Sequence, residues 1–298
     1  MKFPPLVPAF VLGLGLVPSS ACVVTVDSPR EIIREEKRFT VEGTADVRVA
    51  TFDGSIRIQS WDRSDVLIEI EKRGPSKAAV EALQVVVAQR GSVIDLDVKR
   101  PKRESYRGMG FQQSAYARLI VSVPRTTNIL ARTGDGSIRI DRVSGRIELR
   151  TGDGSIRASE VSGDMSFETG DGSVVVERAE GRLGVETGDG SVNVSGSVGA
   201  LKLHTGDGLV IYRAEPGTIM TDDWNITTGD GSVTLYLPAG LSAELDAHTG
   251  DGRITDELDV EKADRDDKLR RTLRGRIGSG GRLLRVRTGD GAIRLKAN

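Results

Sequence analysis

The sequence predicts an all-β protein, a parallel β-solenoid with 18-residue coils, and three observations support this prediction. The tetrapeptide Thr-Gly-Asp-Gly occurs eight times, and the first five copies follow one another at intervals of 18 residues. Glycine supplies 36 of the 298 residues, well above its average usage of roughly 7%. Apolar and polar residues alternate after the glycines, as they do in strands with one buried side. A fixed period of this kind is typical of stacked repeat proteins. The copies begin at Thr133, Thr151, Thr169, Thr187, Thr205, Thr228, Thr249 and Thr288.

Each regular coil divides into two halves of nine residues that share one pattern. Glycine stands at the fourth position of a half, and apolar residues stand at the sixth and eighth, as in Gly154, Ile156 and Ala158. The glycine provides the positive φ or the close approach that a turn requires. A single unit cannot bury its apolar side, whereas stacked coils pair each strand with its equivalent about 4.8 Å away. An antiparallel sandwich is the competing architecture, but it does not require a fixed period.

Residues 1–21 have the features of a secretory signal peptide: Lys2, an apolar stretch interrupted by prolines, and a small-residue end at Ser19-Ser20-Ala21. The stretch is shorter than the roughly 20 apolar residues of a membrane-spanning helix. Cys22, the single cysteine, follows directly. This arrangement resembles a bacterial lipoprotein signal, in which the cysteine is lipidated and becomes the first residue of the mature chain. Ser19 stands where such signals usually carry leucine, so cleavage after Ala21 without lipidation is the alternative. Residues 22–37 are expected to form a charged, lipid-anchored tether.

Residues 38–132 are expected to form a β-rich region that caps the N-terminal end of the solenoid. An uncapped end coil would expose strand edges that pair with other chains. The segment Thr51-Phe52-Asp53-Gly54 is a degenerate copy of the repeat. Ser76 can cap a short helix that runs to about Leu83. Strands are expected at residues 38–42, 46–50, 55–59, 66–71 and 115–123, with a hairpin formed by residues 85–87 and 93–98.

Residues 133–298 form the repeat region, in which the last intervals lengthen to 23, 21 and 39 residues. The turn sequence is kept while the opposite side of the coil grows. The largest insertion lies near residues 257–274, where twelve of eighteen residues are charged and both signs are mixed. Such a pattern indicates a solvated surface. We therefore expect an exposed excursion from the final coils, at most a frayed helix.

The aspartates of the repeat are expected to form a column with one carboxylate per coil. Neighbouring carboxylates about 5 Å apart repel by roughly 0.8 kcal/mol in water, so something must offset this repulsion. The first interpretation is structural, because an aspartate in a turn accepts hydrogen bonds from nearby backbone amides. The alternative is a divalent cation between loops, as in calcium-binding nonapeptide solenoids, but the alternate half-repeats carry no matching aspartate. The column is a structural turn ladder and a weak ligand candidate, and we predict no metal and no cofactor. Its members are Asp135, Asp153, Asp171, Asp189 and Asp207.

Other residues that often carry chemistry are expected to be structural. Thr151 and its equivalents continue the inward alternation and should form a buried hydroxyl ladder. His204 and His248 precede a repeat threonine, at a position where other coils carry charged residues, so both should lie on the surface. Trp61 and Trp224 are isolated and are expected to serve packing.

Two segments resemble a bacterial family of adhesin-like domains whose function is unknown. One is Tyr116–Pro124 followed by recurrent Thr-Gly-Asp-Gly-Ser-Ile/Val, and the other is the closing run from Gly278 to Ile293. The resemblance covers roughly residues 38–298. It implies a β-solenoid that is often tethered to a membrane, and it brings no catalytic residues.

Composition excludes several classes of function. Lys and Arg number 42 against 43 Asp and Glu, which leaves a net charge of −1 and does not suit a nucleic-acid-binding protein. The sequence contains no phosphate-binding loop and no constellation for acyl transfer. We predict no catalytic residues and a non-enzymatic, extracytoplasmic lipoprotein of the cell envelope, an adhesin or surface-binding solenoid.

The expected partners are the membrane, reached through the lipid anchor, and an unidentified envelope protein or surface glycan. Nucleic acid is not expected. One alternative is a scaffold or sensor accessory for another envelope protein. The other is a carbohydrate-active β-helix enzyme, which needs non-repetitive acidic residues in a groove.

Overall fold

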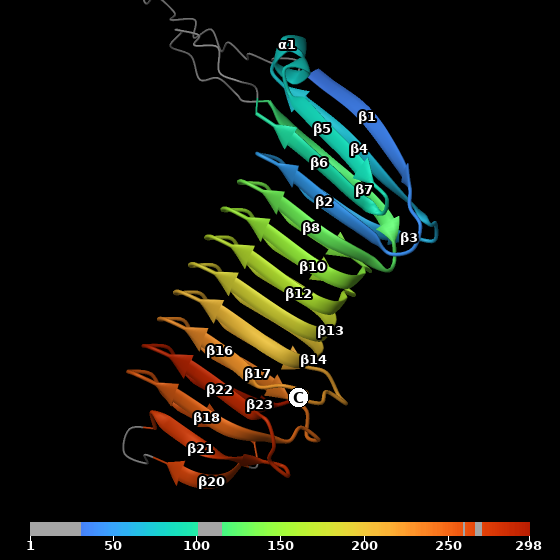
Figure 1. The fold of residues 1–298 in the computed structure, drawn as a ribbon. Helices are drawn as coiled ribbons and strands as arrows, with labels where there is room; N and C mark the ends of the chain where they lie inside the picture. Colours follow the sequence, from blue (N-terminus) through green and yellow to red (C-terminus); the bar gives the residue numbers. More distant parts are fainter. Residues whose placement is uncertain (1–30, 101–114, 259, 266–269) are drawn as a thin grey trace, which may run out of the picture.

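The computed structural model describes residues 31–100, 115–258, 260–265 and 270–298. In these residues the chain is an elongated stack of short strands, joined in one sheet that falls into two facing rows (Figure 1). The predicted all-β, parallel β-solenoid is confirmed. The expected signal peptide and Cys22 lie outside the described residues. No helix in the described part of the chain is both long enough and apolar enough to span a membrane.

The two rows of strands are named face A and face B. From the N-terminal end of the stack, face A contains β5 (Gln84–Arg90), β6 (Val93–Lys99), β2 (Ala45–Thr51), β8 (Thr127–Thr133), β10 (Ser144–Thr151), β12 (Ser162–Thr169), the second halves of β13 (Val174–Thr187) and β14 (Val192–Thr205), β16 (Trp224–Thr228), β22 (Leu283–Thr288), β18 (Ala243–Thr249), β21 (Thr272–Ile277) and β20 (Val260–Arg265). From the same end, face B contains β1 (Glu31–Thr40), β4 (Asp65–Gly74), β7 (Tyr116–Pro124), β3 (Ile56–Trp61), β9 (Ile138–Asp141), β11 (Ile156–Ser159), the first halves of β13 and β14, β15 (Val210–Ala214), β17 (Val233–Leu237), β23 (Ile293–Ala297) and β19 (Ile254–Asp256).

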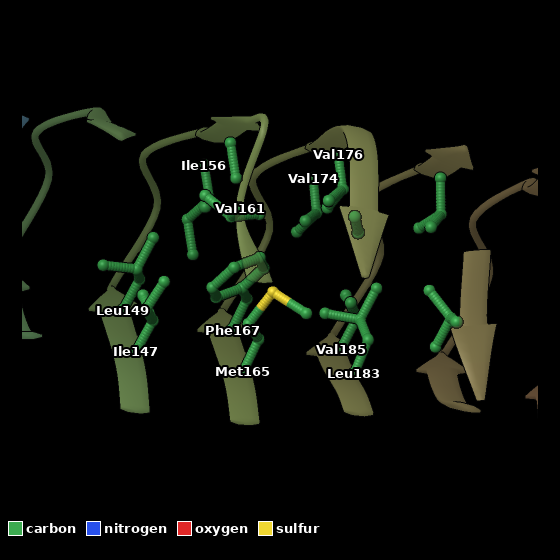
Figure 2. Close-up of a cluster of buried hydrophobic side chains, with 14 of the residues drawn as sticks. Ile147, Leu149, Ile156, Val161, Met165, Phe167, Val174, Val176, Leu183 and Val185 are labelled. Atoms are coloured by element: carbon green, nitrogen blue, oxygen red, sulfur yellow. The ribbon is translucent and has the colours of Figure 1, made fainter. Parts of the chain in front are cut away.

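The core lies between the two faces, as the alternation predicts. Ile147 and Leu149 of face A point towards Ile156 of face B, and each is fully buried (Figure 2). β10 pairs with β12, and β11 with β13, in parallel without any shift, so equivalent residues stack. The pairing of β13 with β14 shifts its register at two places, after Val176 and after Gly181. A third inward position, filled by Val161 at the corner between the faces, is also buried. The nine-residue pattern does not contain this position, so sequence analysis missed it.

The N-terminal end is closed by antiparallel strands. On face A, β5 pairs antiparallel with β6, and on face B, β1 and β4 extend antiparallel from β7. The helix α1 (Lys77–Glu81) begins after Ser76, whose hydroxyl accepts a hydrogen bond from the Ala79 amide at 3.2 Å. One boundary differs from the prediction, because residues 31–37 of the expected tether are the first part of β1. Along β1 only Phe39 is buried, and this edge position explains why the segment lacks a clear apolar alternation.

The C-terminal coils do not stack in the order of the sequence. β22 lies between β16 and β18, and β23 lies between β17 and β19. The last coil of the chain is therefore inserted between two coils that precede it in the sequence. The described residues of the charged segment 257–274 form no helix and contribute β20 and the start of β21, an antiparallel pair that continues face A past β18.

Candidate functional site

The repeat turn is held by its threonine and its first glycine. The hydroxyl of Thr169, a buried residue, donates to the carbonyl oxygens of Gly152 at 3.2 Å and Gly154 at 2.8 Å, both in the preceding coil. The amide of Gly170 also donates to the Gly152 carbonyl, at 2.5 Å. The same bonds recur in neighbouring coils, so the predicted inward hydroxyl ladder is confirmed.

The second glycine of the turn is required by close packing between coils. A Cβ atom placed on Gly154 would lie 2.0 Å from the carbonyl oxygen of Gly136, which is backbone and cannot move aside. Alanine at this position would therefore push two coils apart. The glycine of the other half-repeat meets a second constraint, because Gly163 has a φ of +114° in the region that side chains disfavour.

The five predicted aspartates are brought into one exposed column on the outside of the turns. The expected bonds from turn amides to their carboxylates are absent among the described residues, because the threonine hydroxyl and the glycine amides make the turn bonds instead. No group of three or more metal-ligating side chains occurs in the described part of the chain. The column is a regular acidic feature to which the geometry assigns no chemistry.

Face A exposes charged side chains that pair with one another. Arg146 contacts Glu148 at 3.0 Å, and Arg150 contacts Glu168 at 3.4 Å. These bridges are largely exposed, so each contributes little to stability. They neutralise this part of face A locally.

A shallow hollow of about 420 Å³ crosses face A over β12, β13 and β14. It exists because Gly184 has no side chain between Ser166 and Lys202, its neighbours in the adjacent coils. Asp222 at its rim accepts from the Asp223 amide at 2.9 Å and pairs with Arg182 at 3.3 Å. The hydrogen bond from the Asp223 amide lowers the pKa of Asp222 most, and the guanidinium of Arg182 lowers it further. An acid held ionised in this way is a poor proton donor, so this carboxylate does not suit the general-acid role in glycosidic bond cleavage.

Face B differs from face A in its chemistry near the N-terminal end. Three strands with the pattern Asp-Gly-Ser-Ile-Arg place Arg57, Arg139 and Arg157 in one row, with a row of serines beside it. Sequence analysis did not single out these arginines. Their signal is the recurrence of arginine at the same position of the repeat, which becomes a row once the coils stack.

An ionic cluster joins the strands that close the C-terminal end. Asp246 of β18 accepts hydrogen bonds from Arg287 of β22 and from Arg274 of β21, the latter at 3.2 Å. Partial burial opposes ionisation, but the two guanidiniums outweigh it and lower the pKa of Asp246. The cluster joins β18 to the inserted strand β22 on one side and to β21 on the other.

The histidines and tryptophans lie where they were predicted. His204 and His248 are exposed. Trp224 is fully buried with its ring edge-on to Tyr212, at a centroid distance of 5.2 Å. Trp61 is partly exposed, and the guanidinium of Arg63 lies 5.1 Å from its ring centroid, so both tryptophans serve packing.

The repeat region and most of the strands before it match one family of proteins. The model of the Toastrack DUF4097 family matches residues 45–296, from the start of β2 into β23. The chain belongs to this family. No curated protein matches this Toastrack chain in sequence.

Solved structures similar to this Toastrack chain come from several bacteria. One is named a putative cell adhesion protein from Clostridium sporogenes, with 12% identity, a TM-score of 0.33, and coverage of 90% of this chain and 100% of the other. Another is named a putative adhesin from Bacteroides fragilis, with 10% identity, a TM-score of 0.33, and coverage of 90% and 98%. A third is named a putative lipid binding protein from Parabacteroides distasonis, with 11% identity, a TM-score of 0.38, and coverage of 88% and 96%. Values this low carry no functional argument.

Proposed function

We propose that this Toastrack protein is a non-enzymatic lipoprotein of the bacterial cell envelope that acts as an adhesin or surface-binding module. The observation that carries the proposal is the form of the two faces, where strands in register display exposed side chains in straight rows across many coils. Extended rows suit contact with a polymer or another surface, because they repeat one interaction many times. Face A also carries paired charged side chains, as Arg146 with Glu148 and Arg150 with Glu168.

The anchor in this proposal is Cys22, which follows Ser19-Ser20-Ala21. Glu31, where β1 begins, lies nine positions after Cys22, and an extended chain of that length spans about 30 Å at most. An acyl group on Cys22 therefore keeps the N-terminal end of the solenoid close to the membrane. Several acyl chains give a stable anchor, whereas one chain binds only marginally.

Fractionation of cells that express the full chain tests the anchor. Wild-type protein is expected with the membranes, and Cys22→Ser is expected in the soluble fraction. Ser28→Ala, six residues further along, is the matched control and should stay with the membranes. Membrane retention of Cys22→Ser would refute the anchoring role.

Incubation with isolated envelopes tests the binding role. The Cys22→Ser protein is expected to sediment with envelopes from cells that lack the gene, and to release no reducing ends from envelope polysaccharide. Failure to sediment contradicts a surface-binding module. Release of reducing ends supports the carbohydrate-active enzyme instead.

A further inference from the structure

Face B carries a straight row of three arginines near its N-terminal end. Arg57 of β3 pairs in register with Arg139 of β9, which pairs in register with Arg157 of β11. All three side chains are exposed. Neighbouring strands in a sheet lie about 4.8 Å apart, so three guanidiniums repeat at this distance along the solenoid axis. We call Arg57, Arg139 and Arg157 the arginine row.

The arginine row is not neutralised within the described residues. None of its three members forms an ion pair there, whereas Arg146, Arg150 and Arg182 of face A each contact a carboxylate within 3.4 Å. Stacked like charges repel each other, and a fold gains nothing from placing them together. The charge of the row is therefore available to a ligand.

Small hydrogen-bonding side chains lie on both sides of the arginine row. Ser55, Ser137 and Ser155 precede the arginines by two positions, directly before β3, β9 and β11 begin. Gln59, Asp141 and Ser159 follow the arginines by two positions within the same strands, and residues two apart in a strand point to the same side of the sheet. The surface thus presents guanidiniums in the centre, with hydroxyl, amide and carboxyl groups at the flanks. It is built from strands in regular register, which makes it flat and suited to an extended ligand.

We propose that the arginine row binds a linear anionic polysaccharide that lies along the solenoid axis. Acidic groups of the polymer would face the three guanidiniums, which form paired hydrogen bonds with carboxylates, and its hydroxyl groups would face the flanking serines. The proposal names a ligand class for the surface-binding role proposed above and rests on that role.

Neighbouring residues favour a thin polymer over an anionic membrane. The same row continues towards the N-terminal end through Ile120 and Glu69 to Glu36, which brings two carboxylates into line with the arginines. A flat anionic membrane wide enough to meet the arginines would also meet these carboxylates and be repelled. A single polymer strand can contact the three arginines and end, or turn away, before it reaches the carboxylates of Glu69 and Glu36.

Binding of polygalacturonate to the full chain carrying Cys22→Ser tests the proposal, with neutral dextran as the polymer control. We expect binding at low ionic strength that weakens as salt is added. The triple variant Arg57→Gln/Arg139→Gln/Arg157→Gln should bind about tenfold or more weakly. The triple variant Arg146→Gln/Arg150→Gln/Arg182→Gln removes the same net charge from face A and should change affinity by less than about twofold.

Several outcomes would overturn the proposal. Equal losses in the two triple variants would mean that only net charge matters, and unchanged binding of the arginine-row variant would place the ligand elsewhere. Binding to phosphatidylglycerol vesicles without binding to polygalacturonate would assign the row to a membrane. If the glutamine variant fails to fold, Arg57→Lys/Arg139→Lys/Arg157→Lys keeps the charge but loses the paired hydrogen bonds, and its affinity should still fall. If the wild type ignores polygalacturonate but sediments with envelopes, the ligand class is wrong and the proposed function stands.

Discussion

Thr249 donates a hydrogen bond from its hydroxyl to the carbonyl oxygen of Gly291 at 2.8 Å, although the two residues are 42 positions apart. In the regular coils the equivalent bond joins residues 15 positions apart and runs back to the preceding coil, as from Thr169 to Gly154. Thr249 instead bonds a coil that comes later in the chain. The C-terminal coil therefore lies between two coils that both come earlier in the chain.

Truncation after Arg282 should destabilise the C-terminal third of the solenoid. The deletion removes Leu284, Val286, Ile293 and Leu295, all fully buried, and burial of such side chains contributes about 1.5–3 kcal/mol each. It also opens a gap between β16 and β18 rather than shortening the stack by one coil. We expect early unfolding and rapid proteolysis within residues 238–282. Arg285→Ala, an exposed position in the same strand, is the control, and a truncated protein that melts like the wild type would contradict the inserted order.

Gly154→Ala should cost about 2–4 kcal/mol in the free energy of unfolding. The added Cβ atom would lie 2.0 Å from the Gly136 carbonyl oxygen, so the two coils must separate. Gly240→Ala is the matched control, because a Cβ atom there has no neighbour within 4 Å. Urea unfolding of the three proteins measures the difference. Similar midpoints for both variants would show that the turn is not tightly packed.

Asp246 should make the protein less stable in acid. Its pKa in the folded state lies below that in the unfolded state, because Arg287 and Arg274 favour the ionised form. Its contribution is therefore fully present above the unfolded pKa and is lost as the pH falls through the folded pKa. Asp246→Asn should lower the melting temperature near neutral pH and should flatten its decline in acid. Parallel curves for the wild type and the variant across the acidic range would contradict this account.

Asp171→Asn separates a passive acidic column from a calcium site. The carboxylate is exposed and takes no part in the turn bonds of the described residues. Substitution should leave stability unchanged or raise it slightly, since it removes repulsion from the neighbouring aspartates. Added calcium should not shift the melting temperature of either protein. A wild-type melting temperature that rises with micromolar calcium, and falls again on chelation, would establish a bound cation through linkage.

The solenoid could be predicted from the sequence because its period follows from local spacing. Glycine, threonine and alternating apolar residues impose the same conditions on every coil, and the structure meets them at Gly154, Thr169 and Ile156. The short helix after Ser76 and the hairpin of β5 and β6 were predicted from capping and turn signals that are equally local.

The order of the last coils could not be predicted in the same way. The turns at Thr249 and Thr288 have the same sequence, so either coil can pack on the coil of Thr228 with the same bonds. Only the length and pairing of the intervening segment decide between them. The arginine row was missed for a related reason, since each arginine is an ordinary exposed residue in its own strand and becomes a feature only when Arg139 and Arg157 are stacked.

In the regular coils the amide of the first glycine of the turn bonds to the coil before it, as from Gly170 to Gly152 and from Gly188 to Gly170. Duplication of one 18-residue segment within the regular coils would therefore extend the rod by about 4.8 Å without requiring any change elsewhere. The length of the rod is therefore a quantity that duplication or deletion of one repeat can change in equal steps.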